Sequence, residues 1–273
     1  MRCSGLLATP GTLFNMKLSS IISTRHRSRF SSKARNYFNR LDAAGDTTYT
    51  AYKQPLANYI DSLVALGGAY WDTMESSASF VGVGIQGVTV PLRDGMPSIT
   101  NNNFVAGDLN QLTGLRGNGS TKYLSTGINA TDLSQNDASI STYVTVPDLS
   151  FNYLAGAFGG LLSKIALVST GTSTRADAFT GATSNDFGTA LGVGLLGASR
   201  SSSTSQDRRS NQTNYPHTVL SEPPVSATID IFTASGIHYP TYARIATYHV
   251  GPALNLATIE GLQETLILEV AAI

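Results

Sequence analysis

Apolar residues recur at helical spacing in two stretches near the start of the chain. The first stripe follows Ser31 or Ser32, either of which can serve as an N-cap, and ends before Gly45. The second can be capped by Thr47 or Thr48, tolerates Pro55 in its first turn, and ends before Gly67-Gly68. The residues of the two stripes are Ala34, Tyr37, Phe38 and Leu41, and then Leu56, Tyr59, Ile60, Leu63 and Leu66. The pattern predicts two amphipathic helices over 31–80, with a further helical turn from Tyr70 to Met74.

Beyond Gly82 the pattern of apolar and polar residues changes. Short apolar runs are separated there by Gly, Asn, Asp and Pro, which is typical of strands joined by turns. The runs are 88–92, 112–115, 123–124, 140–146, 153–158, 165–168, 191–198, 228–232 and 244–250. Within 139–146 apolar and polar residues alternate, so one side of that strand should face a core. This succession of short apolar runs and turn residues predicts an all-β sandwich.

The stretch Gly114 to Ile128 is the clearest local signal in the chain. Leu115 and Tyr123 flank Gly117-Asn118-Gly119-Ser120, and Asn-Gly supplies the positive φ angles that a tight β-hairpin turn requires. We expect strand, turn, strand. The polar run 199–214 is either a linker or an exposed hairpin, and its place between apolar runs favours the hairpin.

The last strand, 243–250, is followed by a predicted helix from about Leu256. Ile259, Leu262, Leu266 and Ile267 should form its inner face. Trp71, the only tryptophan, could stack on a sugar, but an aromatic residue at helical spacing is more often part of the core.

The net charge of zero conceals an uneven distribution. Residues 1–40 hold eight Lys or Arg and no acid, which leaves ten basic and eighteen acidic residues in the other 233. Such a basic arm can bind nucleic acid, an anionic membrane or an acidic protein surface, or it can be a solvated terminus. Residues 1–30 could be a short amphipathic helix or an extended segment, and the pattern favours neither. The attachment residues we expect are Arg25, Arg27, Arg29, Lys33 and Arg35.

Cys3 is the only cysteine, so an internal disulfide and a cysteine-clustered metal site are excluded. The apolar runs are shorter than the roughly 20 residues that a membrane span needs, and Asn15 and Lys17 interrupt the only stretch that could serve as a signal peptide. We expect a soluble protein synthesised in a cytoplasm, without membrane insertion and without a cofactor.

The sequence contains no clear set of catalytic residues. No two of the five glutamates share a strand, as the paired carboxylates of a glycosidase would, since three fall on the terminal helix and Glu75 and Glu222 are isolated. No serine lies in a G-x-S-x-G turn, and no glycine run is followed by G-K-[ST]. His249 lies on a predicted strand, where a hydrogen-bonded structural histidine is the favoured interpretation.

A lectin site remains conceivable. It needs a carboxylate, amides and an aromatic residue at the rim of a sheet, and the candidates for this ligand rim are Asn101, Asn102, Asn103, Asp108 and Asn110. Asn-rich segments also make good turns, and that interpretation is favoured.

The segment Asn101 to Leu124 (N-N-N-F-V-A-G-D-L-N-Q-L-T-G-L-R-G-N-G-S-T-K-Y-L), the helical segment before it and the closing I-A-T-Y strand with its helix resemble bacteriophage virion proteins with a concanavalin A-like (laminin G-like) jelly-roll domain. The resemblance covers about residues 32–273. It implies a mainly β, antiparallel jelly-roll sandwich with an N-terminal helical segment and a C-terminal helix. The domains expected are a basic arm (1–30), a helical cap (31–85) and the sandwich (86–273).

The function implied is that of a non-enzymatic virion structural protein, in a tail, fibre or capsid-associated position, attached through its N-terminal region. Its expected partners are other virion proteins and further copies of itself, and nucleic acid is not expected. The alternative is a receptor-binding lectin that recognises host cell-surface polysaccharide. A glycan-degrading enzyme is the remote alternative.

Overall fold

The structure is a computed structural model that describes residues 30–159, 164–181 and 185–273. Within it, Ser32–Ile273 forms one compact unit. The predictions for the basic arm, including Arg25, Arg27 and Arg29, therefore lie outside the described residues.

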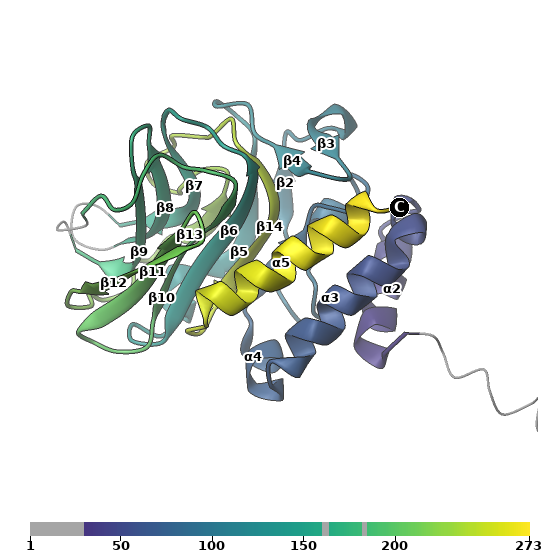
Figure 1. The fold of residues 1–273 in the computed structure, drawn as a ribbon, viewed down its shortest axis with the longest axis horizontal. Coiled ribbons are helices and arrows are strands. Elements are labelled where there is room, and N and C mark those ends of the chain that lie inside the picture. The colour runs from purple at the N-terminus through teal and green to yellow at the C-terminus, as the bar shows by residue number, and fades with distance from the viewer. Residues whose placement is uncertain (1–29, 160–163, 182–184) are drawn as a thin grey trace, which may run out of the picture. The chain divides into compact units, whose positions relative to one another are not determined.

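Two antiparallel sheets face each other in this unit, and helices cover the outer side of the larger one (Figure 1). This mainly β sandwich, with helices before and after the strands in the described chain, confirms the predicted fold class. The larger sheet has the order β12-β11-β10-β6-β14-β4-β3, and β1 also pairs with β14. Its strands are β1 (Ser76–Ser79), β3 (Leu109–Asn110), β4 (Gly114–Arg116), β6 (Ala138–Val146), β10 (Gly194–Arg200), β11 (Ser205–Ser210), β12 (Thr213–Thr218) and β14 (Arg244–Gly251).

The smaller sheet has the order β2-β5-β13-β7-β8-β9. Its strands are β2 (Thr100–Asn102), β5 (Tyr123–Asn129), β7 (Phe151–Phe158), β8 (Lys164–Thr170), β9 (Thr174–Thr180) and β13 (Thr228–Ile231). On β5, Leu124, Thr126 and Ile128 are buried while the residues between them are more exposed. On this strand one face therefore lies on the core and the other is turned away from it.

The helices are α2 (Ser32–Ala43), α3 (Lys53–Ala65), α4 (Gly68–Thr73) and α5 (Leu256–Ala271), with short 3-10 helices at Thr48–Tyr52, Gly87–Thr89, Ala106–Asp108 and Ala130–Asp132. Helix α5 crosses the larger sheet, and α3 packs beside it (Figure 1). As a result the central strands are buried on both faces: Ile140 and Val144 of β6 are fully buried, and so is Ser141 on the opposite side. The predicted alternation is present, but both sides of β6 are covered.

The N-terminal helices largely match the prediction. The four apolar residues of the first stripe are buried in α2, Pro55 lies in the first turn of α3, and Trp71 is buried as a core residue. The expected Thr caps are wrong, because a 3-10 helix occupies Thr48–Tyr52 and the residue that precedes α3 is Tyr52. Leu66 lies beyond the end of α3 and is 41% exposed.

Two segments differ from the prediction because strand pairing depends on distant partners. Residues 76–79, predicted within the helical segment, form β1 and pair with residues 247–250 of β14. The apolar run 88–92 forms no strand; the 3-10 helix over 87–89 falls in it instead. The polar run after β10 does form the favoured hairpin, β11 and β12, which turns at Asn211 and Gln212, both with positive φ.

The Gly117–Ser120 turn is present, but it is not a hairpin. β4 belongs to the larger sheet and β5 to the smaller one, so the turn carries the chain between sheets. Gly119 has φ +64° and donates its N–H to the Thr241 carbonyl at 3.2 Å. Gly117 has no room for a side chain, because an added Cβ would lie 2.0 Å from that same carbonyl oxygen. The two glycines allow the chain to turn closely against the segment that precedes β14.

At Ala178, side chains of the larger sheet contact the β9 edge of the smaller sheet. Gln206 of β11 accepts the Ala178 N–H at 2.8 Å, and Arg200 of β10 donates Nε–H to the Ala178 carbonyl at 2.6 Å. These contacts satisfy backbone groups of β9 that no neighbouring strand pairs.

Candidate functional site

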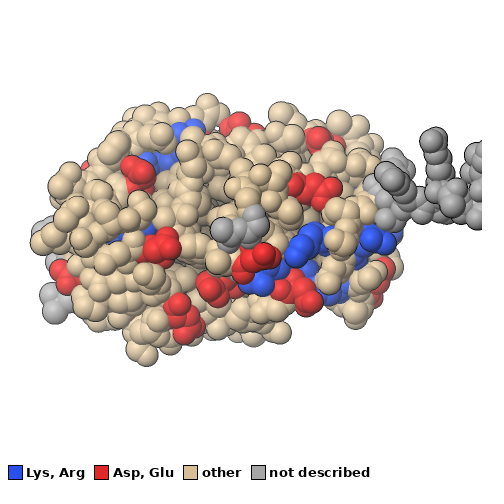
Figure 2. All heavy atoms as spheres, turned by 90° about the horizontal axis from the view of Figure 1, so that it is seen from below, with Lys and Arg blue, Asp and Glu red and all other residues tan. Residues whose placement is uncertain are grey.

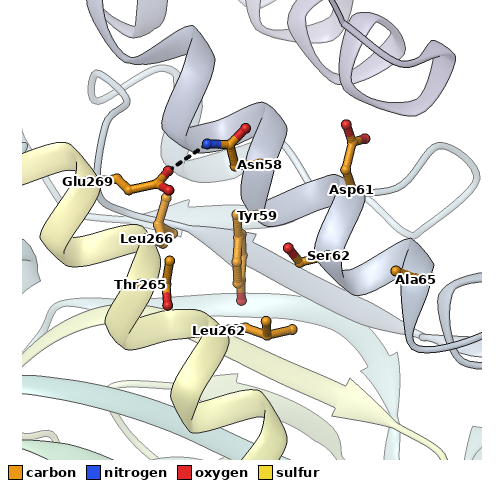
Figure 3. A pocket seen from close by; sticks show the side chains of 9 residues that line it. All are labelled: Asn58, Tyr59, Asp61, Ser62, Ala65, Leu262, Thr265, Leu266 and Glu269. Carbon is orange, nitrogen blue, oxygen red and sulfur yellow. Dashed lines mark hydrogen bonds between the residues drawn. The ribbon is translucent and has the colours of Figure 1, made fainter.

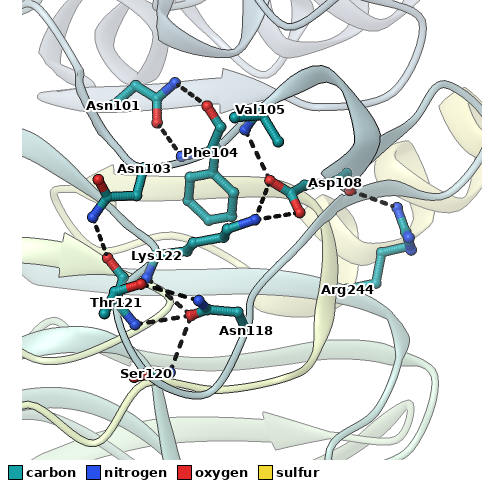
Figure 4. A network of polar contacts seen from close by, with 10 residues as sticks. All are labelled: Asn101, Asn103, Phe104, Val105, Asp108, Asn118, Ser120, Thr121, Lys122 and Arg244. Carbon is teal, nitrogen blue, oxygen red and sulfur yellow. Dashed lines mark hydrogen bonds and ion pairs between the residues drawn. The ribbon is translucent and has the colours of Figure 1, made fainter.

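The predicted ligand rim forms a network of polar contacts beside the turn at 117–120 (Figure 4). Asn101 donates to the Phe104 carbonyl at 3.0 Å and accepts the Phe104 N–H at 2.9 Å. Asn103 donates to the Thr121 carbonyl at 3.0 Å, which links the two Asn-rich loops. Both amides thus serve the backbone of their own turns.

Asp108 lies in the same network. Its carboxylate is 2.5 Å from Lys122 Nζ and accepts the Val105 N–H at 2.8 Å. Asn110 and Asn102 do not join it: Asn110 accepts the Leu112 N–H at 2.9 Å, and Asn102 donates to the Thr100 carbonyl at 3.5 Å. The structure brings Asn101, Asn103 and Asp108 together, with their polar atoms engaged within the protein.

Asn118 holds the centre of this turn. Its Oδ1 accepts the backbone N–H groups of Ser120, Thr121 and Lys122 at 2.9 to 3.0 Å (Figure 4). Such side-chain to backbone bonds are the reason that Asn favours turns. These hydrogen bonds therefore hold the conformation of the loops at the predicted ligand rim.

A cluster of aromatic rings, which the sequence analysis did not single out, lies on the outer face of the smaller sheet. We define this aromatic surface as Phe151, Tyr153, Phe158 and Tyr239. The Phe151 ring stands nearly perpendicular to those of Tyr153 and Tyr239, each at 6.0 Å between centroids. Phe151 and Tyr239 are 50% and 53% exposed, while Tyr153 is buried beneath them. The two exposed rings, Phe151 and Tyr239, thus form a corner: they meet nearly at a right angle above the buried ring of Tyr153.

Asp148 joins the two segments that carry these rings. Its Oδ1 accepts the Ser150 N–H at 3.0 Å, and its Oδ2 accepts the Tyr242 N–H at 2.8 Å. The Tyr153 N–H bonds to the Tyr239 carbonyl at 2.9 Å. Phe151 and Tyr239 are therefore held against each other by backbone contacts and one buried carboxylate.

A polar group lies next to the aromatic surface. Asp230 of β13 stands opposite Ser125 of β5 and is only 4% exposed. Burial raises the pKa of Asp230 to about 6, although a hydrogen bond from Ser125 and the charge of His238 act in the opposite direction. The His238 ring in turn packs edge-on against Tyr123 at 6.4 Å.

A groove runs between α3 and α5 on the far side of the larger sheet (Figure 3). It has a volume of about 380 Å³, with Tyr59, Leu262 and Leu266 among its lining residues. Asn58 donates to Glu269 at 2.9 Å across one end, and Asp61 lies on the α3 side (Figure 3).

His249 is the structural histidine that was expected. It is fully buried below α3, its Nε2 lies 2.7 Å from the Tyr59 hydroxyl, and its Nδ1 lies 2.9 Å from Ser77 Oγ. Burial lowers its pKa to about 3. A substrate cannot reach this Ser–His pair, so it is not a hydrolase site.

The expected attachment residues Lys33 and Arg35 belong to α2. Lys and Arg side chains gather over the N-terminal helices, intermixed with acids (Figure 2). Lys33 lies 3.8 Å from Asp72, and Arg40 donates to the Leu92 carbonyl at 2.9 Å. This patch thus supports the packing of the helices as well as presenting charge.

Within residues 30–159, 164–181 and 185–273, no three His, Cys, Asp or Glu side chains are grouped so that they could hold a metal ion. None of the helices in these ranges is long and apolar enough to cross a membrane.

No protein-family model and no curated protein matches the chain. Solved structures do. A structure of botulinum neurotoxin type C, whose cell entry is dependent upon interaction with two ganglioside molecules, aligns over 73% of this chain and 53% of its own, with TM-score 0.51 and 10% identity. A Trypanosoma rangeli sialidase in complex with sialic acid aligns over 77% and 36%, with TM-score 0.50 and 15% identity. Domain 4 of a Geobacillus stearothermophilus arabinanase, in complex with arabinotriose, aligns over 70% and 98%, with TM-score 0.47 and 15% identity.

The chain spans about a third of the sialidase and about half of the neurotoxin structure. At these identities the likeness establishes the β-sandwich fold and nothing finer. The sequence contained only a weak signal for the aromatic surface: the run I-H-Y-P-T-Y at 237–242 places two tyrosines, of which Tyr239 belongs to the surface, in a segment without strand alternation.

Proposed function

We propose that the protein is a non-enzymatic structural protein of a bacteriophage virion whose sandwich binds host cell-surface polysaccharide. The observation that carries the binding function is the corner formed by the exposed rings of Phe151 and Tyr239. Aromatic faces pack against the C–H faces of sugar rings, and rigid aromatic residues lose little entropy on binding. The fold is shared with solved structures that bind sialic acid or interact with gangliosides, which supports the same class of ligand.

The arrangement of carboxylates supports a binding protein over an enzyme. Asp230 and Asp177 point to the outer face in one row across the smaller sheet, through Gly156 and Ala166. Three strand spacings separate their backbones by about 14 Å. Glycosidase carboxylates lie roughly 5–10 Å apart, and both of these side chains are buried.

The binding function is tested with a glycan array and with titrations of the glycans that bind. Replacing Tyr239 with Ala should weaken binding by about tenfold, because loss of one stacked ring costs on the order of 1–2 kcal/mol. Leu220→Ala is the matched control, since Leu220 is also exposed but lies outside the aromatic surface. A protein that binds no glycan, or a Tyr239→Ala variant that binds normally, contradicts the assignment.

The virion function is tested by assembly. Because Ser32–Ile273 is compact by itself, removal of residues 1–30 should leave the melting temperature nearly unchanged while abolishing incorporation into particles. Replacement of Arg25, Arg27 and Arg29 with Glu should weaken incorporation in a salt-dependent way. Unfolding of the truncated protein would place the arm in the core. Normal assembly would require another attachment surface.

A further inference from the structure

A second pocket, with a volume of about 230 Å³, lies between the N-terminal helices and the segment 92–94. Helix α2 contributes Lys33 and Arg40 to its lining, α4 contributes Trp71, and the segment contributes Arg93. Lys33 is exposed, whereas Trp71 is only 2% exposed. The pocket therefore leads from the surface toward the core.

Two of the lining residues carry a buried N–H group without an acceptor. Among the described residues, no atom accepts a hydrogen bond from the Trp71 indole Nε1 or from Arg93 Nε, and both nitrogen atoms are buried. Buried donors without an acceptor are costly and uncommon in folded proteins. The pocket that Trp71 and Arg93 line offers room for an acceptor.

The guanidinium groups of the pocket have only uncharged acceptors. Arg40 donates to Asn36 Oδ1 at 3.1 Å and otherwise to the backbone carbonyls of residues 91–93. The hydrogen bonds of Arg93 also go to backbone carbonyls. Burial lowers the pKa of Arg40, which means that the interior disfavours its charge. A bound anion would offset this positive charge and form charge-assisted hydrogen bonds.

Two acids also line the pocket, but both are exposed to water. The carboxylate of Asp72 is 3.8 Å from Lys33 Nζ, too far for a hydrogen bond, and the two side chains are 66% and 48% exposed. Asp94 is exposed, and its carboxylate accepts the Gly95 N–H at 3.0 Å. Water screens exposed charges more than buried ones. The three cations of the lining exceed the acids by one, so the pocket as a whole is positive.

We propose that this pocket binds a small oxyanion group, a carboxylate or a phosphate, whose oxygens accept the N–H groups of Trp71 and Arg93 beside the charge of Lys33. Its volume is below the roughly 300–1,000 Å³ of most ligand pockets, so it admits the charged end of a ligand. The site shares no residue with the aromatic surface and does not depend on glycan binding.

Tryptophan fluorescence of the full chain reports on this pocket directly, because Trp71 is the only tryptophan. The probes are inorganic phosphate, methyl phosphate and acetate, each added at constant ionic strength with sodium chloride as the reference. We expect a saturable change in emission, and titration calorimetry should give the same affinity. Saturation by the two phosphates alone assigns the pocket to a phosphate group, and saturation by acetate alone assigns it to a carboxylate. The proposal is overturned if neither method detects saturable binding of any probe.

Three variants locate the site, and calorimetry measures each. Trp71→Phe keeps an aromatic ring but removes the N–H, and Lys33→Ala removes an exposed charge; each should weaken binding by about tenfold. Lys33→Ala should keep its melting temperature, so it tests the site even if Trp71→Phe is unstable. Arg116→Ala, which removes one exposed charge on β4 outside the pocket, should bind normally. Normal binding by a folded Trp71→Phe, or equal weakening in Lys33→Ala and Arg116→Ala, overturns the proposal.

Discussion

Glu260 Oε2 on α5 lies 2.5 Å from Arg209 Nε on β11, and the Glu260 side chain is almost completely buried. Its other oxygen accepts the Leu195 N–H at 2.8 Å. This carboxylate therefore joins the C-terminal helix to two strands of the larger sheet. Removal of one partner leaves the other buried and unpaired.

We expect Glu260→Ala to lower the free energy of unfolding by about 3–5 kcal/mol, measured by denaturant titration. Glu264→Ala is the control. Glu264 accepts a hydrogen bond from Gln212 on the surface, so its loss should cost about 0.5 kcal/mol or less. Equal effects of the two substitutions would mean that the Glu260 contact does not stabilise the helix on the sheet.

Replacing Gly119 with Val should destabilise the protein by about one to a few kcal/mol. A side chain at φ +64° is strained, and its Cβ would lie 2.0 Å from the Tyr242 ring. Gly107 has open space around it and no positive φ, so Gly107→Val serves as the comparison in thermal unfolding. An unchanged melting temperature for Gly119→Val would show that the loop rearranges without cost.

His249 should make the protein less stable in acid. Its pKa is about 3 in the folded state and 6.5 ordinarily, so between these values the unfolded state binds a proton that the folded state does not. The free energy of unfolding should fall as pH is lowered through this window, by at most about 1.4 kcal/mol per pH unit from this group. Denaturant titrations of His249→Asn at several pH values should show a smaller slope; an identical slope would contradict a buried neutral imidazole.

The titration of Asp230 should have the opposite effect on the free energy of unfolding: it should make the protein less stable as pH rises. Its pKa is raised to about 6 from 3.8, so between these values the folded state holds a proton that the unfolded state lacks. Its contribution to stability is present at low pH and is lost as pH rises through about 6. In Asp230→Asn, stability should decline less between pH 4 and 6 than in the wild type. If the two profiles coincide, the carboxyl of Asp230 is not protonated in the folded state.

Asp148 should matter for glycan binding through the segments that it holds. In Asp148→Ala the Ser150 and Tyr242 N–H groups lose their acceptor, so Phe151 and Tyr239 should no longer be held at a fixed angle. We expect glycan affinity to fall severalfold, and Asp148→Asn, which keeps one acceptor oxygen, to recover part of it. Titration calorimetry on folded variants makes this comparison. Full affinity in Asp148→Ala would show that the rings hold their own geometry.

Local patterns predicted the helices, most strands and the turn at Gly119, because each depends on residues close together in sequence. Which sheet a strand joins depends on distant partners, and for this reason a hairpin was expected where the chain in fact passes from β4 to β5. The buried side of α5 was also only partly predicted. Glu260 faces inward because Arg209 meets it there, and no pattern within the helix reveals that partner.

Local sequence patterns were also insufficient to predict the candidate site. The Asn-rich rim stood out by composition, and its amides proved to be engaged with the backbone of their own loops. The aromatic surface forms only when the 151–158 strand and the 237–242 segment are brought together, which the sheet order and Asp148 achieve. A cluster of this kind is visible in sequence only as scattered rings.

The contacts of Gln206 and Arg200 with β9 hinder strand pairing between neighbouring molecules. An uncovered strand edge can recruit the edge of a neighbouring molecule and begin cross-β aggregation, and this danger grows with local concentration. Here the backbone groups of Ala178 are already bonded to side chains from the opposite sheet. At this position neither the N–H nor the carbonyl of Ala178 is left to pair with a neighbouring molecule, even when copies of the protein are held close together.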